Sequence, residues 1–322
     1  MDNQFFKQFY LDGVISDASY ENIAQKKANP LISIHWEIKA LLYIGILLLT
    51  TGLGIFVYKN IDTIGHQFIL GLIAIISIGC FAYCFKHKRP FSFYKVETPA
   101  TFFDYLLLLG MLSFLIFIGY LQYQYKIFGT NYGMATFIPM LVLYCAAYGF
   151  DHIGILNMAI VNMGLWLGIT VTPKGLIAQN TFDSATAIYT YLGFGLLLLV
   201  FAQITKRREL KSHFAFSYQH YGVHASFIAL LAGYFFYNNS QLWFLWLVSV
   251  FALSYIIYLQ AFKNKSFYFL VLVILYSYIA FSILVMRVLD VKTIYFITTY
   301  FISSALGLVY LLMRLNKKLK EA

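Results

Sequence analysis

The chain has 322 residues, of which 61% are hydrophobic and 11% are charged, and its mean hydropathy is +0.74. Ordinary globular domains carry about 25% charged residues, so this composition excludes a soluble monomer. Apolar runs long enough to cross a hydrocarbon core of about 30 Å recur along the chain. The pattern predicts an all-α, polytopic helical membrane protein, because a transmembrane β-barrel would show short segments of alternating hydropathy.

The formal net charge of +10 is explained by membrane topology. The basic residues lie between the apolar runs and form no patch with interleaved aromatic residues, so we expect no binding to nucleic acid. Lysine and arginine concentrate on the cytoplasmic side of membrane proteins, and this rule predicts that both chain ends are cytoplasmic. Only five of the 23 basic residues then fall outside: Lys59, Lys126, Lys174, Arg287 and Lys292.

The first element in chain order is polar and spans residues 1–35. Gly13 is typical of the end of a short helix, and Ser16 is a favourable N-cap for a second one. The second helix stops before Pro30. Such an amphipathic helical hairpin is too small to bury a core. We therefore expect it to lie on the membrane surface, on the cytoplasmic ends of the spans, or on a cytoplasmic protein partner.

The hairpin contains the sequence LDGVISDASYENI at residues 11–23, and a long series of apolar runs follows it. This combination resembles the bacterial predicted membrane proteins called domain-of-unknown-function family 2157. In that family acidic residues usually follow the "IS" step, whereas here Asp17 is followed by Ala18 and Ser19. The resemblance implies a multi-pass protein of the bacterial inner membrane. It implies no activity, cofactor or catalytic residue.

A bundle of about ten transmembrane helices is predicted over residues 36–322. Both ends on one side require an even number of spans, which agrees with this count. The fourth span is short and is interrupted by Pro139. The predicted spans are 40–58, 64–85, 101–122, 131–149, 153–171, 184–204, 217–236, 242–261, 266–287 and 292–313.

The ten spans also divide into two halves, 40–172 and 184–313. Five spans in each half would make the halves inverted, as in many secondary transporters. The halves share no motif, however, and their connections differ in length. The sequence leaves open whether they are repeats.

Neutral polar residues are predicted near the middle of the membrane. Pro139 and Asn162 lie at similar distances from the turn between the fourth and fifth spans, and Asn157 lies closer to that turn. A proline frees a backbone carbonyl, so one interpretation is a polar pocket beside a broken helix. The other is a packing kink with hydrogen bonds between helices. Thr299 and Ser303 in the tenth span add hydroxyl groups at similar depth, unless they bond their own backbone.

A second group of polar residues is predicted at the cytoplasmic ends of the spans. Asp104 begins the third span, and Asp151 and His152 form the turn between the fourth and fifth. His220 and His224 share one helix face in the seventh span. Three interpretations of the histidine pair stay open: a metal site, a polar pocket with the other three residues, or ordinary interfacial histidines.

These features favour a transporter or flippase-like carrier of a small or lipidic substrate in the lipid bilayer. The alternative is a non-enzymatic envelope scaffold or regulatory protein that docks a partner through residues 1–35. An enzyme is not expected, because the sequence shows no paired acids, nucleophile–base pair or phosphate loop. We expect no cofactor and no metal.

Overall fold

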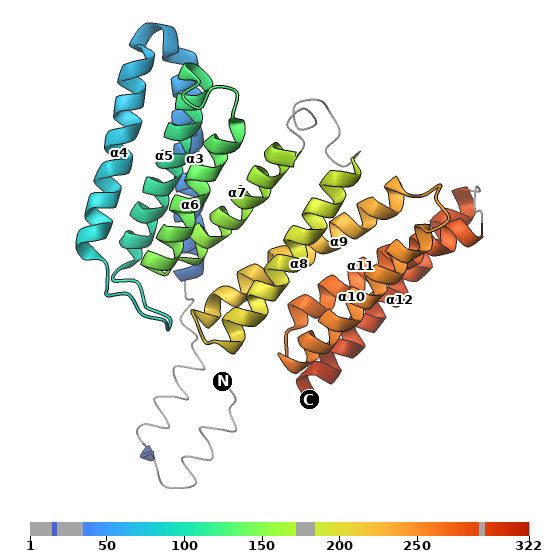
Figure 1. Ribbon diagram of the computed structural model, residues 1–322. Helices are drawn as coiled ribbons and strands as arrows, with labels where there is room; N and C mark the ends of the chain where they lie inside the picture. Colours follow the sequence, from blue (N-terminus) through green and yellow to red (C-terminus); the bar gives the residue numbers. More distant parts are fainter. Residues whose placement is uncertain (1–14, 18–34, 172–183, 290–293, 322) are drawn as a thin grey trace. The chain divides into compact units, whose positions relative to one another are not determined.

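The computed structural model describes residues 15–17, 35–171, 184–289 and 294–321, and the regular secondary structure in these ranges is helical (Figure 1). This confirms the prediction of an all-α polytopic protein. A short 3₁₀ helix, η1 (Ser212–Phe214), precedes α9. The long helices are α3 (His35–Ile64), α4 (His66–His87), α5 (Thr101–Tyr125), α6 (Tyr132–Phe150), α7 (Ile153–Val171), α8 (Ala185–Arg207), α9 (Ala215–Phe236), α10 (Trp243–Lys263), α11 (Phe267–Val288) and α12 (Ile294–Glu321).

Nine of these helices are long and apolar enough to cross a membrane within the described part of the chain. The exception is α9, which the sequence predicts as the seventh span at 217–236. Its 22 residues extend for about 33 Å, so its length suffices. Its polar residues lower the hydropathy, and several of them, such as Gln219 and Ser226, are buried inside the protein. Neighbouring helices therefore cover the polar face of α9.

The chain divides into two compact units at Lys59, within α3. In the first unit, the described part of α3 exposes large apolar side chains, among them Leu41 and Leu48. These side chains are suited to contact with lipid. The predicted hairpin over residues 1–35 lies outside the described residues except at 15–17 and 35, so it stays a prediction.

In the second unit, which begins at Asn60, neighbouring helices pack in pairs. The closest pairs are α4 with α5, α6 with α7, α8 with α9, and α10 with α11. Figure 1 shows α8 and α9 side by side over most of their length. α9 also packs against α7, α10 and α11, which makes it the central helix of this unit.

Two hydrophobic clusters form the core of the second unit. The first joins α4 to α8 and the start of α9 around Leu143 and Leu156. The second joins α9, α10 and α11 around Phe227 and Val250. The clusters meet along α8 and α9, whereas the predicted halves divide at residues 173–183. Whether the halves are inverted repeats stays a prediction.

The contact between α8 and α9 depends on small residues. A Cβ atom on Gly222 would lie 3.0 Å from the backbone oxygen of Gly195 and 3.0 Å from the backbone nitrogen of Leu199. A Cβ atom on Gly195 would lie 2.6 Å from the backbone nitrogen of Ser226. In a membrane the hydrophobic effect does not drive helices together, because the lipid tails are as apolar as the side chains. Small residues let the helix backbones approach closely, so that van der Waals packing stabilises the contact.

Candidate functional site

The predicted midplane residues of α6 and α7 lie on two helices that pack together. Pro139 is buried within α6, and Asn157 and Asn162 are partly buried on α7. The Oδ1 atoms of both asparagines are buried and accept no hydrogen bond from any described residue. A buried acceptor without a partner costs about 1–3 kcal/mol, so both amides are able to accept a hydrogen bond from a ligand or water.

Thr299 and Ser303 occupy a different environment. Both are exposed on α12, and each hydroxyl donates to a backbone oxygen of its own helix at 2.8 Å. No hydrogen bond among the described residues joins them to α6 or α7. Five cavities formed by described residues have linings that do not include Pro139, Asn157 or Asn162. The structure therefore places Pro139 and the two asparagines on adjacent packed helices, and the two hydroxyl residues on α12.

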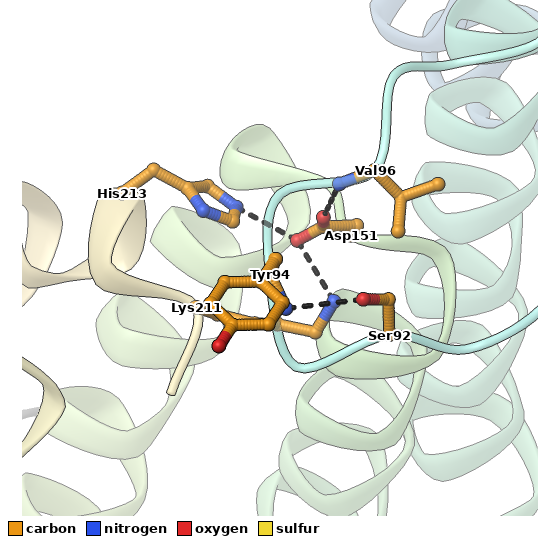
Figure 2. A network of polar contacts seen from close by, with 6 residues as sticks. All are labelled: Ser92, Tyr94, Val96, Asp151, Lys211 and His213. Atoms are coloured by element: carbon orange, nitrogen blue, oxygen red, sulfur yellow. Dashed lines mark hydrogen bonds and ion pairs between the residues drawn. The ribbon is translucent and has the colours of Figure 1, made fainter. Parts of the chain in front are cut away.

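Asp151 is the centre of a buried ionic network at one end of the second unit (Figure 2). Its Oδ1 lies 3.1 Å from Lys211 Nζ and 2.7 Å from His213 Nε2. Its Oδ2 accepts a hydrogen bond of 2.6 Å from the backbone N–H of Val96. The side chains of Asp151 and Lys211 are each only 3% exposed, so their charges compensate each other away from water.

The network joins three of the segments that connect consecutive helices. Asp151 ends α6 in the left-handed conformation, with a φ of 58°. Lys211, also left-handed, comes from the connection between α8 and α9, and its backbone N–H donates to the Phe93 oxygen at 2.7 Å. Phe93 and Val96 belong to the connection between α4 and α5. The sequence predicts all three connections on one membrane side, and the structure brings them together.

His152 caps α7 from the turn between α6 and α7. Its Nδ1 accepts the backbone N–H of Ile155 at 3.2 Å, which assigns the ring proton to Nε2. Nε2 lies 3.9 Å from Asp104 Oδ1. Burial lowers the pKa of His152 to about 4, although the charge of Asp151 opposes this shift. A Cβ atom on Gly154 would lie 2.8 Å from the His152 ring, so this glycine leaves room for the cap.

His220 and His224 form a separate group on α9. His224 Nδ1 shares a hydrogen bond of 2.8 Å with the Tyr276 hydroxyl, and His220 Nδ1 shares one with the Tyr268 hydroxyl. Both tyrosines belong to α11. The predicted cytoplasmic-side cluster therefore divides into two, with Asp104, Asp151 and His152 in one part and these histidines in the other. Within the described ranges no group of three or more His, Cys, Asp or Glu is placed to hold a metal ion.

The sequence does not single out Lys211 and His213 as site residues. Both lie in the basic connection that the positive-inside rule places in the cytoplasm. Their pairing with Asp151 depends on the left-handed turn at Lys211, for which a non-glycine residue gives no sequence signal.

A groove runs between α10, α11 and α12. One cavity, of about 520 Å³, has mainly apolar walls and is lined by residues of all three helices, including Phe251, Phe281 and Leu308. A second cavity, of about 770 Å³, lies between α9, α11 and α12 and includes Arg287. Tyr278 lines both cavities, so the two adjoin. Volumes in this range are typical of ligand pockets, which span about 300–1,000 Å³.

Nine apolar helices, a helical core and a groove between helices define an integral, multi-pass membrane protein. Residues 7–156 match the family model described as "Predicted membrane protein (DUF2157)". The predicted resemblance to this family is confirmed over those residues, which include Asp104, Asp151 and His152. Neither a search of curated proteins nor a search of solved structures returned a match to the chain.

Proposed function

We propose that this protein is a transporter or flippase-like carrier of a lipidic or other small amphiphilic substrate. The observation that carries the proposal is the groove between α10, α11 and α12. Its size suits a ligand, and its walls are mainly apolar. A cavity of this kind between membrane helices offers a lipid tail an environment like the bilayer.

The attachment of α12 supports a groove that opens. Among the described residues, two hydrogen bonds join α12 to α11, between Tyr278 and Ser304 at 2.8 Å and between Ser282 and Tyr300 at 3.0 Å. Hydrogen bonds between membrane helices contribute only about 0.6 kcal/mol on average, so these contacts break readily. Movement of α12 relative to α11 would admit a substrate from the side.

The experiment that tests transport uses the purified chain in lipid vesicles. A fluorescent phospholipid is placed in both leaflets and the quencher is added outside, so that the label of the outer leaflet is lost at once. The fraction of inner-leaflet label that becomes accessible over time is then measured. We expect lipid to cross faster in vesicles with the protein than in protein-free vesicles. Equal rates, with or without an imposed ion gradient, would refute a lipid carrier.

We also propose that the protein lies in the bacterial inner membrane with both termini cytoplasmic. Two basic connections, α4–α5 and α8–α9, meet the turn between α6 and α7 around Asp151, which supports a common side for all three. Fusions of a cytoplasm-active and a periplasm-active reporter to each chain end test this orientation. Activity of the periplasmic reporter at either end would overturn it.

The substrate is expected to cross unchanged. The carboxylate of Asp151, the most deeply buried of the candidate acids, is already engaged by Lys211, His213 and Val96, which supports a structural role.

The second candidate is a scaffold or regulatory protein that docks a partner through residues 1–35. It is favoured by the division of the chain at Lys59, which separates the segment that contains the predicted hairpin from the second unit. Deletion of residues 1–30 should then abolish co-purification of the partner and leave the helices folded. Retention of the partner by the shortened chain would exclude this role.

A further inference from the structure

We infer that the cavity between α9, α11 and α12 binds the headgroup of an anionic phospholipid, with Arg287 as the residue that recognises it. The inference names the substrate class of the proposed carrier and rests on that function. The adjoining groove between α10, α11 and α12 would receive the acyl chain.

Neutral groups hold Arg287 in place. Its Nη1 donates to the Tyr234 hydroxyl at 3.2 Å and to Asn238 Oδ1, and its Nη2 donates to the Asn238 backbone oxygen at 3.0 Å. The guanidinium carbon lies 4.0 Å from the centre of a Trp243 ring. These contacts orient the guanidinium group, and none of these partners carries a negative charge.

Two N–H groups of Arg287 remain for a ligand. A guanidinium has five N–H groups, and the contacts with Tyr234 and Asn238 use three of them. No acidic side chain among the described residues pairs with it, while Asp290 lies outside those residues. Arginine donates to phosphate through a planar fork, and such charge-assisted hydrogen bonds are roughly twice as strong as neutral ones. A phosphate group matches both the charge and the donors.

The position of Arg287 suits a lipid headgroup. It lies in the last turn of α11, beside Tyr234 and Trp243, and such aromatic residues are enriched at the membrane–water interface. From there to Val273, the groove-lining residue of α11 farthest from Arg287, α11 extends about 21 Å. The hydrocarbon of one leaflet is about 15 Å thick, half of the whole core. The groove can therefore follow an acyl chain through its own leaflet.

The apolar walls favour a phospholipid over a free anion. Ile279, Ile283 and Met286 line the cavity that contains Arg287, and the groove beyond it is more apolar still. Inorganic phosphate would contact only the polar end. A lipid would also place its acyl chain along these walls, which resemble the hydrocarbon of the bilayer.

The test measures equilibrium binding to the purified full chain in detergent. Short-chain phosphatidylglycerol and phosphatidylcholine, which share tails and differ in net charge, are titrated in parallel by native mass spectrometry. We expect wild type to bind phosphatidylglycerol about tenfold more tightly, because both lipids carry the phosphate but the choline cation of phosphatidylcholine cancels the net negative charge that attracts Arg287. Equal affinities would overturn the inference, and so would displacement of the lipid by millimolar inorganic phosphate.

Variants then locate the preference. Arg287→Gln should remove it, and Arg287→Lys should keep part of it because the charge remains without the fork. Lys126→Gln is the matched control, since it removes an exposed positive charge at the end of α5, away from the groove. A preference that persists in Arg287→Gln would overturn the inference. If that variant does not fold, the comparison is made with Arg287→Lys, which must show a reduced preference.

Binding and transport are separated by this design. Selective binding without lipid movement in vesicles would refute the proposed carrier and leave the headgroup site in place. Lipid movement without a preference for the anionic headgroup would overturn the inference alone.

Discussion

The buried pair of Asp151 and Lys211 makes the sharpest prediction for a single residue. Asp151→Asn removes the negative charge and leaves the Lys211 ammonium group buried at 3% exposure. Breaking a buried ion pair from one side costs about 3–5 kcal/mol. We expect a clearly lower midpoint of thermal unfolding in detergent.

Two controls accompany this variant. Glu97→Gln removes an exposed carboxylate near the same network and should change the midpoint little. The double variant Asp151→Asn with Lys211→Met should recover much of the loss, because no charge is then buried. If Asp151→Asn unfolds like wild type, the pair has no structural role.

The lowered pKa of His152 predicts how the stability of the folded protein depends on pH. Burial lowers its pKa from 6.5 to about 4, so the unfolded chain binds the proton more readily between these values. Stability contributed by neutral His152 is therefore present above pH 6.5 and decreases as the pH falls toward 4. The expected loss is about 3 kcal/mol.

The measurement compares unfolding midpoints across pH 7 to 4 for wild type and His152→Asn. Asparagine can still cap α7 but does not titrate, so the variant should lose less stability on acidification. Identical pH profiles would show that His152 is not the responsible group.

At this scale the sequence predicts the grouping of Asp104, Asp151 and His152, because each lies at the same end of its span. It does not predict that Asp151 pairs with Lys211 and His213. That contact requires a left-handed residue at Lys211, which neither hydropathy nor residue type reveals.

Among the elements, α8 and α9 make the closest approach and therefore the strongest prediction. Gly222→Leu would place a side chain 3.0 Å from backbone atoms of Gly195 and Leu199, which cannot move without separating the helices. Overpacking of this kind typically costs about 1–3 kcal/mol. The variant should unfold at a lower temperature than wild type.

Gly193→Leu is the matched control on α8. A Cβ atom there meets nothing within 4 Å, so the variant adds the same side chain without a clash. Leucine forms helix more readily than glycine, so helix propensity alone would stabilise both variants. Equal destabilisation by both variants would mean that the contact between α8 and α9 does not set the cost.

The predicted spans agree with the helices to within a few residues, except at both ends of α3 and at the end of α12. α12 continues from its predicted end at residue 313 to Glu321, and α3 begins at His35 before its predicted start at residue 40. Hydropathy reports where a helix leaves the lipid, while backbone hydrogen bonds decide where it ends. The helix of α9 is predicted close to its observed bounds. Hydropathy does not reveal, however, that neighbouring helices bury its polar residues.

For the whole molecule, the sequence predicts the class of protein because composition alone excludes a water-soluble monomer. It cannot predict the groove, whose walls come from residues of α10, α11 and α12 that are brought together only by packing. The same holds for Arg287, which the sequence presents only as one of five outside basic residues. Its neighbours Tyr234, Asn238 and Trp243 come from α9, α10 and the turn between them.

The most direct test of the carrier is lipid movement in vesicles that contain a variant with a filled groove. Gly307 lines the groove, and a Cβ atom there meets nothing within 4 Å, so Gly307→Phe adds bulk into open space. Gly119→Phe adds the same bulk to an exposed position on α5 that also meets nothing within 4 Å. We predict that labelled phospholipid crosses at least about tenfold more slowly with Gly307→Phe, a loss equal to 1.4 kcal/mol, while Gly119→Phe behaves like wild type. Unchanged movement through folded Gly307→Phe would contradict a substrate path along this groove.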